Sequence, residues 1–227
     1  MGVFLQQTVN GLTVGGIYAL IALGYTMVYG VLRLINFAHG DLSVLGAYIG
    51  LVVLTGGAGG GNTQTLLVVL AFIVAVIVVG GVGAVLEFTA YRPLRKADRL
   101  AAVVSALGAS LLIENGIMLI WGPQLRVFPQ DLLPSGHWEA LGARIDLLQI
   151  LIIAGSALLM GALYLFVHHT RFGTAMRAAA IDQDAARLMG INVNRVITSV
   201  FIIGPALGAI GGLVIGLYYR QGYFKIG

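Results

Sequence analysis

The sequence predicts an all-α fold, a polytopic bundle of transmembrane helices, from its composition and from its apolar runs. Hydrophobic residues make up 59% of the 227 residues and charged residues only 10%, against about 45–50% and about 25% in soluble domains. Several apolar runs reach the length of about 20 residues that an α-helix needs to cross a bilayer. A water-soluble globule is excluded, because so few charged side chains cannot cover its surface. The 33 glycines suit closely packed membrane helices.

We expect about six membrane spans, one of them short or broken. Five runs are long enough to cross as straight helices: 11–32, 66–86, 101–121, 147–167 and 196–219. The sixth candidate, residues 42–54, is only 13 residues long. Extending it back to residue 35 gives sufficient length, but the extension places polar side chains inside the span.

The charged residues predict the orientation of the chain. Connections 90–100 and 168–195 each hold four basic residues, whereas connection 55–65 has no charge. Basic loops stay in the cytoplasm, so we place these two connections there and connections 55–65 and 122–146 outside. If residues 42–54 cross, Arg33 is cytoplasmic and the N-terminus is external; if they re-enter, both assignments reverse. We favour the crossing.

Three polar side chains, Asn36, His39 and Asp41, lie within six residues, beside or inside the short span. Polar groups in a membrane segment are costly and usually face a cavity, a partner helix or a transport pathway. One interpretation is a broken helix that lines a translocation path, as in discontinuous transporter helices. The alternative is a cytoplasmic turn in which Asp41 caps the next helix through its side-chain oxygen.

Glu114 is a carboxylate two-thirds of the way along the run 101–121. An ionisable residue at this depth is a functional candidate by default. It could instead lie near the external interface, or be protonated and hydrogen-bonded to a neighbouring helix.

The second basic connection contains a candidate helix over residues 174–188, preceded by Gly173 and ended by Gly190. At helical spacing, an apolar side forms from Ala178, Ile181, Ala185 and Leu188, while Arg177 and Asp184 share another side. Such a helix is either a plain interfacial helix or a docking element for a cytoplasmic partner.

Catalytic and metal-binding patterns are missing from the sequence. There is no cysteine, no Walker lysine motif and no metalloprotease or serine-hydrolase motif. We therefore expect no catalytic residue, no cofactor and no metal site. The net charge of +4 comes from scattered basic residues, and we expect no nucleic-acid partner.

Four collinear segments carry a resemblance to a known family. They read NGLTVGGIYALIALGY (Asn10–Tyr25), RLINFAHGDLSVLGAY (Arg33–Tyr48), YRPL (Tyr91–Leu94) and RFGTAMRAAAIDQDAARLMGINVNRVI (Arg171–Ile197). With these segments the chain resembles the permease subunit of branched-chain amino-acid ABC importers of the LivH type, and the resemblance covers nearly the whole chain. Members of that family continue with further spans, so the chain is expected to be truncated at its C-terminus.

The resemblance implies a single transmembrane permease domain over residues 1–227, integral to a bacterial or archaeal plasma (inner) membrane, that does no chemistry itself. It implies four partner subunits: a second permease, two cytoplasmic ATPase subunits and an extracytoplasmic substrate-binding protein. The transported substrate would be leucine, isoleucine, valine or a related amino acid, and membrane lipid would surround the bundle. Residues 169–195 would form a cytoplasmic coupling loop, whose candidate residues are Arg177, Ala179, Asp182, Asp184, Arg187 and Gly190.

We expect the translocation path or its gate to involve Asn36, His39, Asp41 and Glu114. Two alternatives remain open. One is a related ABC permease for urea or short amides. The other is an ion-coupled secondary transporter that uses Glu114 or Asp41 as its proton site.

Overall fold

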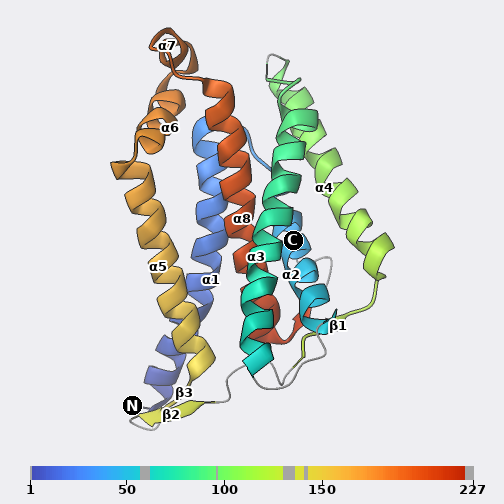
Figure 1. Ribbon diagram of the computed structural model, residues 1–227, viewed down its shortest axis with the longest axis vertical. Coiled ribbons are helices and arrows are strands. Elements are labelled where there is room, and N and C mark those ends of the chain that lie inside the picture. Colours follow the sequence, from blue (N-terminus) through green and yellow to red (C-terminus); the bar gives the residue numbers. More distant parts are fainter. Residues whose placement is uncertain (1, 57–61, 96, 130–135, 141–142, 223–227) are drawn as a thin grey trace.

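A computed structural model describes the chain except for residues 1, 57–61, 96, 130–135, 141–142 and 223–227. Within that part, six helices are long and apolar enough to cross a membrane, as expected, and they lie side by side (Figure 1). The long helices are α1 (Gly2–Leu32), α2 (His39–Gly56), α3 (Asn62–Leu86), α4 (Arg99–Trp121), α5 (Leu147–His169) and α8 (Val193–Tyr219). A π-helical turn, η1 (Glu87–Tyr91), extends α3, and two short helices, α6 (Arg171–Ile181) and α7 (Gln183–Leu188), connect α5 to α8.

Helix α8 is the centre of the bundle, and α1, α2 and α3 all pack against it. Small residues bring the backbones into contact, as is common between membrane helices. A Cβ atom added to Gly24 of α1 would lie 2.4 Å from the carbonyl oxygen of Gly204. One added to Gly212 would lie 1.9 Å from the carbonyl oxygen of Ser43 in α2. At these contacts the helix spacing therefore depends on glycine.

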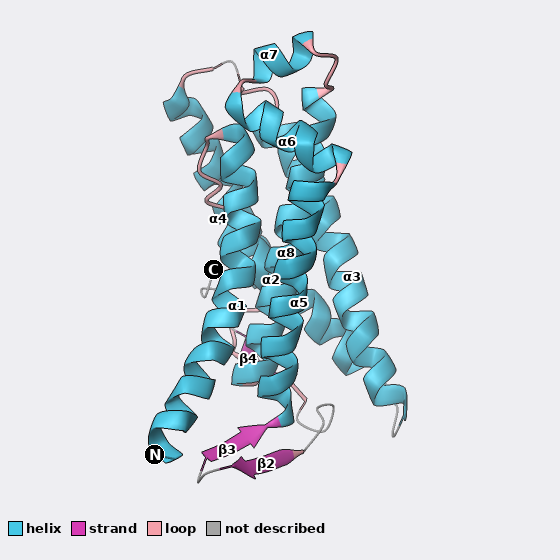
Figure 2. Ribbon diagram, turned by 90° about the vertical axis from the view of Figure 1, so that its left-hand side faces the viewer, coloured by secondary structure: helices cyan, strands magenta, loops and turns pink. Residues whose placement is uncertain are grey.

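The two ends of the bundle differ in charge. Helices α6 and α7, the end of α1 and the start of α8 gather at one end, the top of Figure 1. The N-terminus and a hairpin of β2 (His137–Ala140) and β3 (Ala143–Asp146) lie at the other end (Figure 2). Because both basic connections are at the first end, we call it the cytoplasmic end. Helix α2 runs from inside the bundle to the opposite end, so the expected crossing is confirmed.

One local expectation is wrong. The single helix over residues 174–188 is two helices, because Asp182 has extended backbone angles (φ −150°, ψ 114°) and separates α6 from α7. The connection 122–146 has regular structure of its own. It contains the β2–β3 hairpin and the strand β1 (Arg126–Val127), which pairs with β4 (Gln221–Gly222) after α8.

Candidate translocation path and coupling loop

The chain between α1 and α2 enters the bundle without helical structure, and Asn36 organises it. The side chain is 2% exposed. Its Oδ1 accepts hydrogen bonds from the Tyr91 hydroxyl at 2.9 Å and from the backbone N–H of Ala38 at 3.1 Å. The bond to Ala38 fixes the turn that starts α2. The capping role expected as an alternative for Asp41 is therefore wrong, because α2 already begins at His39 and the Asp41 side chain bonds elsewhere.

His39 begins α2 deep inside the protein. Its Nε2 lies 3.0 Å from the carbonyl oxygen of Ile21 in α1, and since a carbonyl only accepts, this contact places a proton on Nε2. Ile21 lies eleven residues before the end of α1, which is about 16 Å of helix. The hydrocarbon core of a bilayer is about 30 Å thick. Helix α2 therefore starts near the middle of the membrane.

Asp41 and Glu114 come together across the contact between α2 and α4. The carboxylate oxygen Oδ2 of Asp41 accepts a hydrogen bond from Ser110 Oγ at 2.5 Å. Glu114 follows Ser110 by one helical turn on α4 and is half-buried. Ser110 lies eleven residues from the start of α4, so its contact with Asp41 also lies near mid-membrane. Glu114 lies one helical turn nearer the external end of α4, and its position at the external interface stays an open prediction.

The path residues form two groups on α2 and the segment before it. Asn36 and His39 contact η1 and α1, while Asp41 contacts α4, the helix that carries Glu114. Among the described residues, Asn36 Nδ2 and His39 Nδ1 are buried polar atoms without a hydrogen-bond partner. Such atoms are costly unless something else satisfies them. Water or a transported solute could do so.

The candidate residues of the 169–195 loop divide into an inner and an outer set. Arg177 donates to the carbonyl oxygen of Val167 at the end of α5, and Ala179 is buried in the core. These two residues hold α6 against the bundle. The outer set is exposed and consists of Asp182, Asp184, Arg187 and Gly190.

The outer set shapes α7. Asp182 Oδ1 accepts hydrogen bonds from the backbone N–H groups of Asp184 at 2.8 Å and Ala185 at 3.0 Å. These bonds, that from Ala185 most strongly, hold the pKa of Asp182 below its usual value. Asp184 also pairs with Arg187 at 2.5 Å. Gly190 has φ +81°, which confirms it as the glycine that follows the helix end.

Large apolar side chains cluster at the outer tip of this loop. Ile181, Leu188 and Met189 are 78%, 89% and 82% exposed. They stand at or just after the ends of α6 and α7, the two short helices at the cytoplasmic end (Figure 1). Exposed apolar groups of this size mark a surface that contacts a protein partner or the membrane. Both expectations, a docking element and an interfacial helix, therefore stay open.

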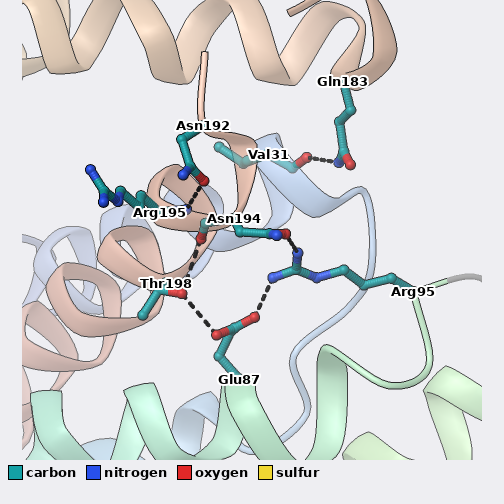
Figure 3. A network of polar contacts seen from close by, with 8 residues as sticks. All are labelled: Val31, Glu87, Arg95, Gln183, Asn192, Asn194, Arg195 and Thr198. Atoms are coloured by element: carbon teal, nitrogen blue, oxygen red, sulfur yellow. Dashed lines mark hydrogen bonds and ion pairs between the residues drawn. The ribbon is translucent and has the colours of Figure 1, made fainter. Parts of the chain in front are cut away.

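A buried ion pair at the cytoplasmic end was not anticipated from the sequence. Glu87 of η1 is fully buried, and its Oε1 pairs with Arg95. The hydroxyl of Thr198 in α8 donates a hydrogen bond to the other carboxylate oxygen of Glu87, Oε2, at 2.9 Å. Arg95 also donates to Asn194 at 2.7 Å (Figure 3). The network ties the end of α3 to the start of α8. Glu87 directly follows the apolar run 66–86, so the sequence pattern placed it at a span boundary.

Six apolar helices, one of them starting inside the bundle, define an integral membrane protein. Residues 7–227 match the family described as branched-chain amino acid transport system / permease component. The chain belongs to this family, and as a permease component it works with the other subunits of a transport system.

Several characterised proteins are similar to the chain over most of its length. The high-affinity branched-chain amino acid transport system permease protein BraD of Pseudomonas aeruginosa is 42% identical over 221 residues, 95% of this chain and 72% of that protein. LivH of Escherichia coli K12 is 40% identical over 230 residues, 95% of this chain and 71% of that protein. A probable LivH of Methanocaldococcus jannaschii is 28% identical over 86% of this chain and 61% of that protein. No solved structure matches the chain significantly.

Proposed function

We propose that the chain is the permease subunit of an ABC importer that moves leucine, isoleucine, valine or related amino acids across the inner membrane. The observation that carries the proposal is the similarity to BraD and LivH over 95% of the chain, joined to an exposed apolar tip where an ATPase would bind. The names of these relatives favour branched-chain amino acids over urea or short amides. The chain itself is non-catalytic, and ATP is hydrolysed by partner subunits.

The full assembly contains a second, related permease, two cytoplasmic ATPase subunits and an extracytoplasmic binding protein that delivers the amino acid. The ATPase subunits bind the tip formed by Ile181, Leu188 and Met189. The cap at Asp182 and the pair of Asp184 with Arg187 keep α7 folded for that contact. Residues 1–227 act as one transmembrane domain, within which residues 169–195 form the coupling loop.

The translocation path runs past the start of α2. Three observations support this placement: α2 begins near mid-membrane, the buried Asn36 Nδ2 and His39 Nδ1 have no partner among the described residues, and the Asp41 carboxylate lies beside the break, bonded to Ser110. The N-terminus of a helix broken in the membrane carries partial positive charge and suits the carboxylate group of a substrate. Asp41 and Glu114 supply negative charge for an ammonium group.

The docking part of the proposal is tested by charging the tip. Leu188→Glu in the full complex places a carboxylate in the ATPase contact, and we expect the ATPase subunits to be lost on purification in mild detergent. Val127→Glu is the matched control, because Val127 is 62% exposed at the opposite end of the bundle. Retention of the ATPase subunits by both variants would remove the tip from the interface.

The coupling residues are tested with Asp182→Ala and Asp184→Ala. We expect ATP hydrolysis stimulated by substrate and binding protein to fall, because α7 loses its cap or its ion pair. Unchanged stimulation would show that these two carboxylates do not take part in coupling.

A further inference from the structure

The break between α6 and α7 is hydrogen-bonded to the chain that leaves α1. Arg33 Nη2 donates to the carbonyl oxygens of Ala180 at 3.0 Å and Ile181 at 3.3 Å. On the other side of the break, Gln183 Nε2 donates to the carbonyl oxygen of Val31 at 3.1 Å (Figure 3). Residues 147 to 152 positions apart in the sequence are therefore joined on both sides of Asp182.

These bonds cap two helix ends reciprocally. The last carbonyl groups of a helix have no partner within it and carry partial negative charge. Arg33 supplies donors and a positive charge to the end of α6, and Gln183 supplies a donor to the end of α1. Arg33 itself has φ +54°, an unfavourable conformation for a residue with a side chain. Its N–H bonds to the carbonyl oxygen of Tyr29 at 2.7 Å, so the turn that aims its side chain at α6 is fixed.

The same short segment leads directly to the broken helix. Asn36 follows Arg33 by three residues and makes the turn that starts α2, and His39 is the first residue of that helix. A displacement of the α6–α7 break therefore pulls on the segment that sets where α2 begins. No packed helix has to relay the movement.

We propose that Arg33 and Gln183 form a reciprocal clamp that passes movement of the coupling loop to the start of α2. They are positioning residues, and the inference rests on the proposed function, since it takes residues 169–195 as the coupling loop and the start of α2 as part of the path. The clamp acts only if both donors are present, because each holds a different side of the break.

The experiment uses the full complex in proteoliposomes and the variants Arg33→Met and Gln183→Leu, which keep side-chain length and remove the donors. Arg195→Met and Gln7→Leu are matched controls, because both side chains are exposed and neither bonds to another side chain within the described part of the chain. Transport, ATP hydrolysis and subunit content are measured together. We expect intact complexes that still hydrolyse ATP but move about fivefold fewer amino acids per ATP, the effect of one net hydrogen bond on an equilibrium. Arg33→Lys restores part of the ratio.

A second measurement reports on the segment itself. Residues 1–227 hold no cysteine, so Ile35→Cys, at a position 41% exposed, adds one thiol to this stretch, which a water-soluble maleimide can label. We expect its labelling rate to change when ATP is added to the complex, and to lose that change when Gln183→Leu is combined with it. Gln7→Leu in the same background leaves the change in place.

Three results would overturn the clamp: a normal transport ratio in either variant, a fall in transport and ATP hydrolysis by the same factor, or an ATP-dependent labelling change that survives Gln183→Leu. Failure of the proposed function is distinguishable, because it appears in the unmutated complex as an absence of branched-chain amino-acid uptake.

Discussion

Removing the carboxylate of Glu87 tests whether the buried ion pair holds the cytoplasmic end together. The Glu87 side chain is fully buried and that of Arg95 is 13% exposed, so Glu87→Ala leaves a guanidinium in a dry site without its counter-charge. Breaking one side of a buried pair costs about 3–5 kcal/mol. Because Arg95 keeps its bond to Asn194, we expect the lower part of this range, about 3 kcal/mol, in the free energy of unfolding.

The assay is equilibrium unfolding of the purified protein in mixed micelles, followed by helical circular dichroism. Arg144→Ala is the control, because it breaks an ion pair with Asp146 whose side chains are 65% and 56% exposed, and exposed pairs contribute at most about 1 kcal/mol. The double variant Glu87→Leu/Arg95→Met removes both charges and should recover most of the stability. A loss below about 1 kcal/mol for Glu87→Ala, or a double variant as unstable as the single one, would refute the reasoning.

Three further predictions concern the loop, the packing and the path. The lowered pKa of Asp182 means that its cap contributes stability above the carboxyl pKa of the unfolded chain and loses it as pH falls through the folded pKa. Hydrogen-exchange protection of α7 should therefore hold down to about pH 5 and fail only in stronger acid. Asp182→Ala should lower the protection wherever the Asp182 carboxylate is ionised and should match the unmutated protein in strong acid. Equal protection in both proteins at neutral pH would contradict the cap. Gly212→Ala should lower the free energy of unfolding by about 1–3 kcal/mol, because the added Cβ meets the Ser43 carbonyl. Gly116→Ala is the control and should not destabilise the protein, because Gly116 has open space around it. Similar values for the two variants would refute close packing at Gly212. Asp41→Asn should lower amino-acid uptake severalfold at unchanged complex yield, and normal uptake would remove Asp41 from the path.

The apolar runs located five of the six spans in the described part of the chain, because burial in lipid requires about 20 apolar residues in a row whatever the neighbours are. The sixth run, residues 42–54, was recognised as a short span. The broken start of α2 was also visible, since polar residues within a span interrupt such a run. The composition of residues 174–188 suggested one helix, because alanine spacing carries no information about backbone angles at a single residue. The one signal in the sequence for a second helix was Asp182, because aspartate often caps the start of a helix.

The contacts that build the site join residues far apart in the sequence. Asn36 meets Tyr91, Asp41 meets Ser110, and Glu87 meets Thr198. One sequence identifies such polar residues as candidates but does not pair them, because pairing depends on how the helices pack around α8. The role of Glu87 was missed for this reason, since a carboxylate at the end of an apolar run usually faces water.

The most direct test of the account is leucine uptake by the full complex in proteoliposomes, with the binding protein outside and ATP inside. We predict uptake that requires ATP, both permeases and the ATPase subunits, and that is lost in Leu188→Glu while Val127→Glu remains active. Leucine uptake driven by an ion gradient without the ATPase subunits, or ATP-dependent uptake unaffected by Leu188→Glu, would contradict it.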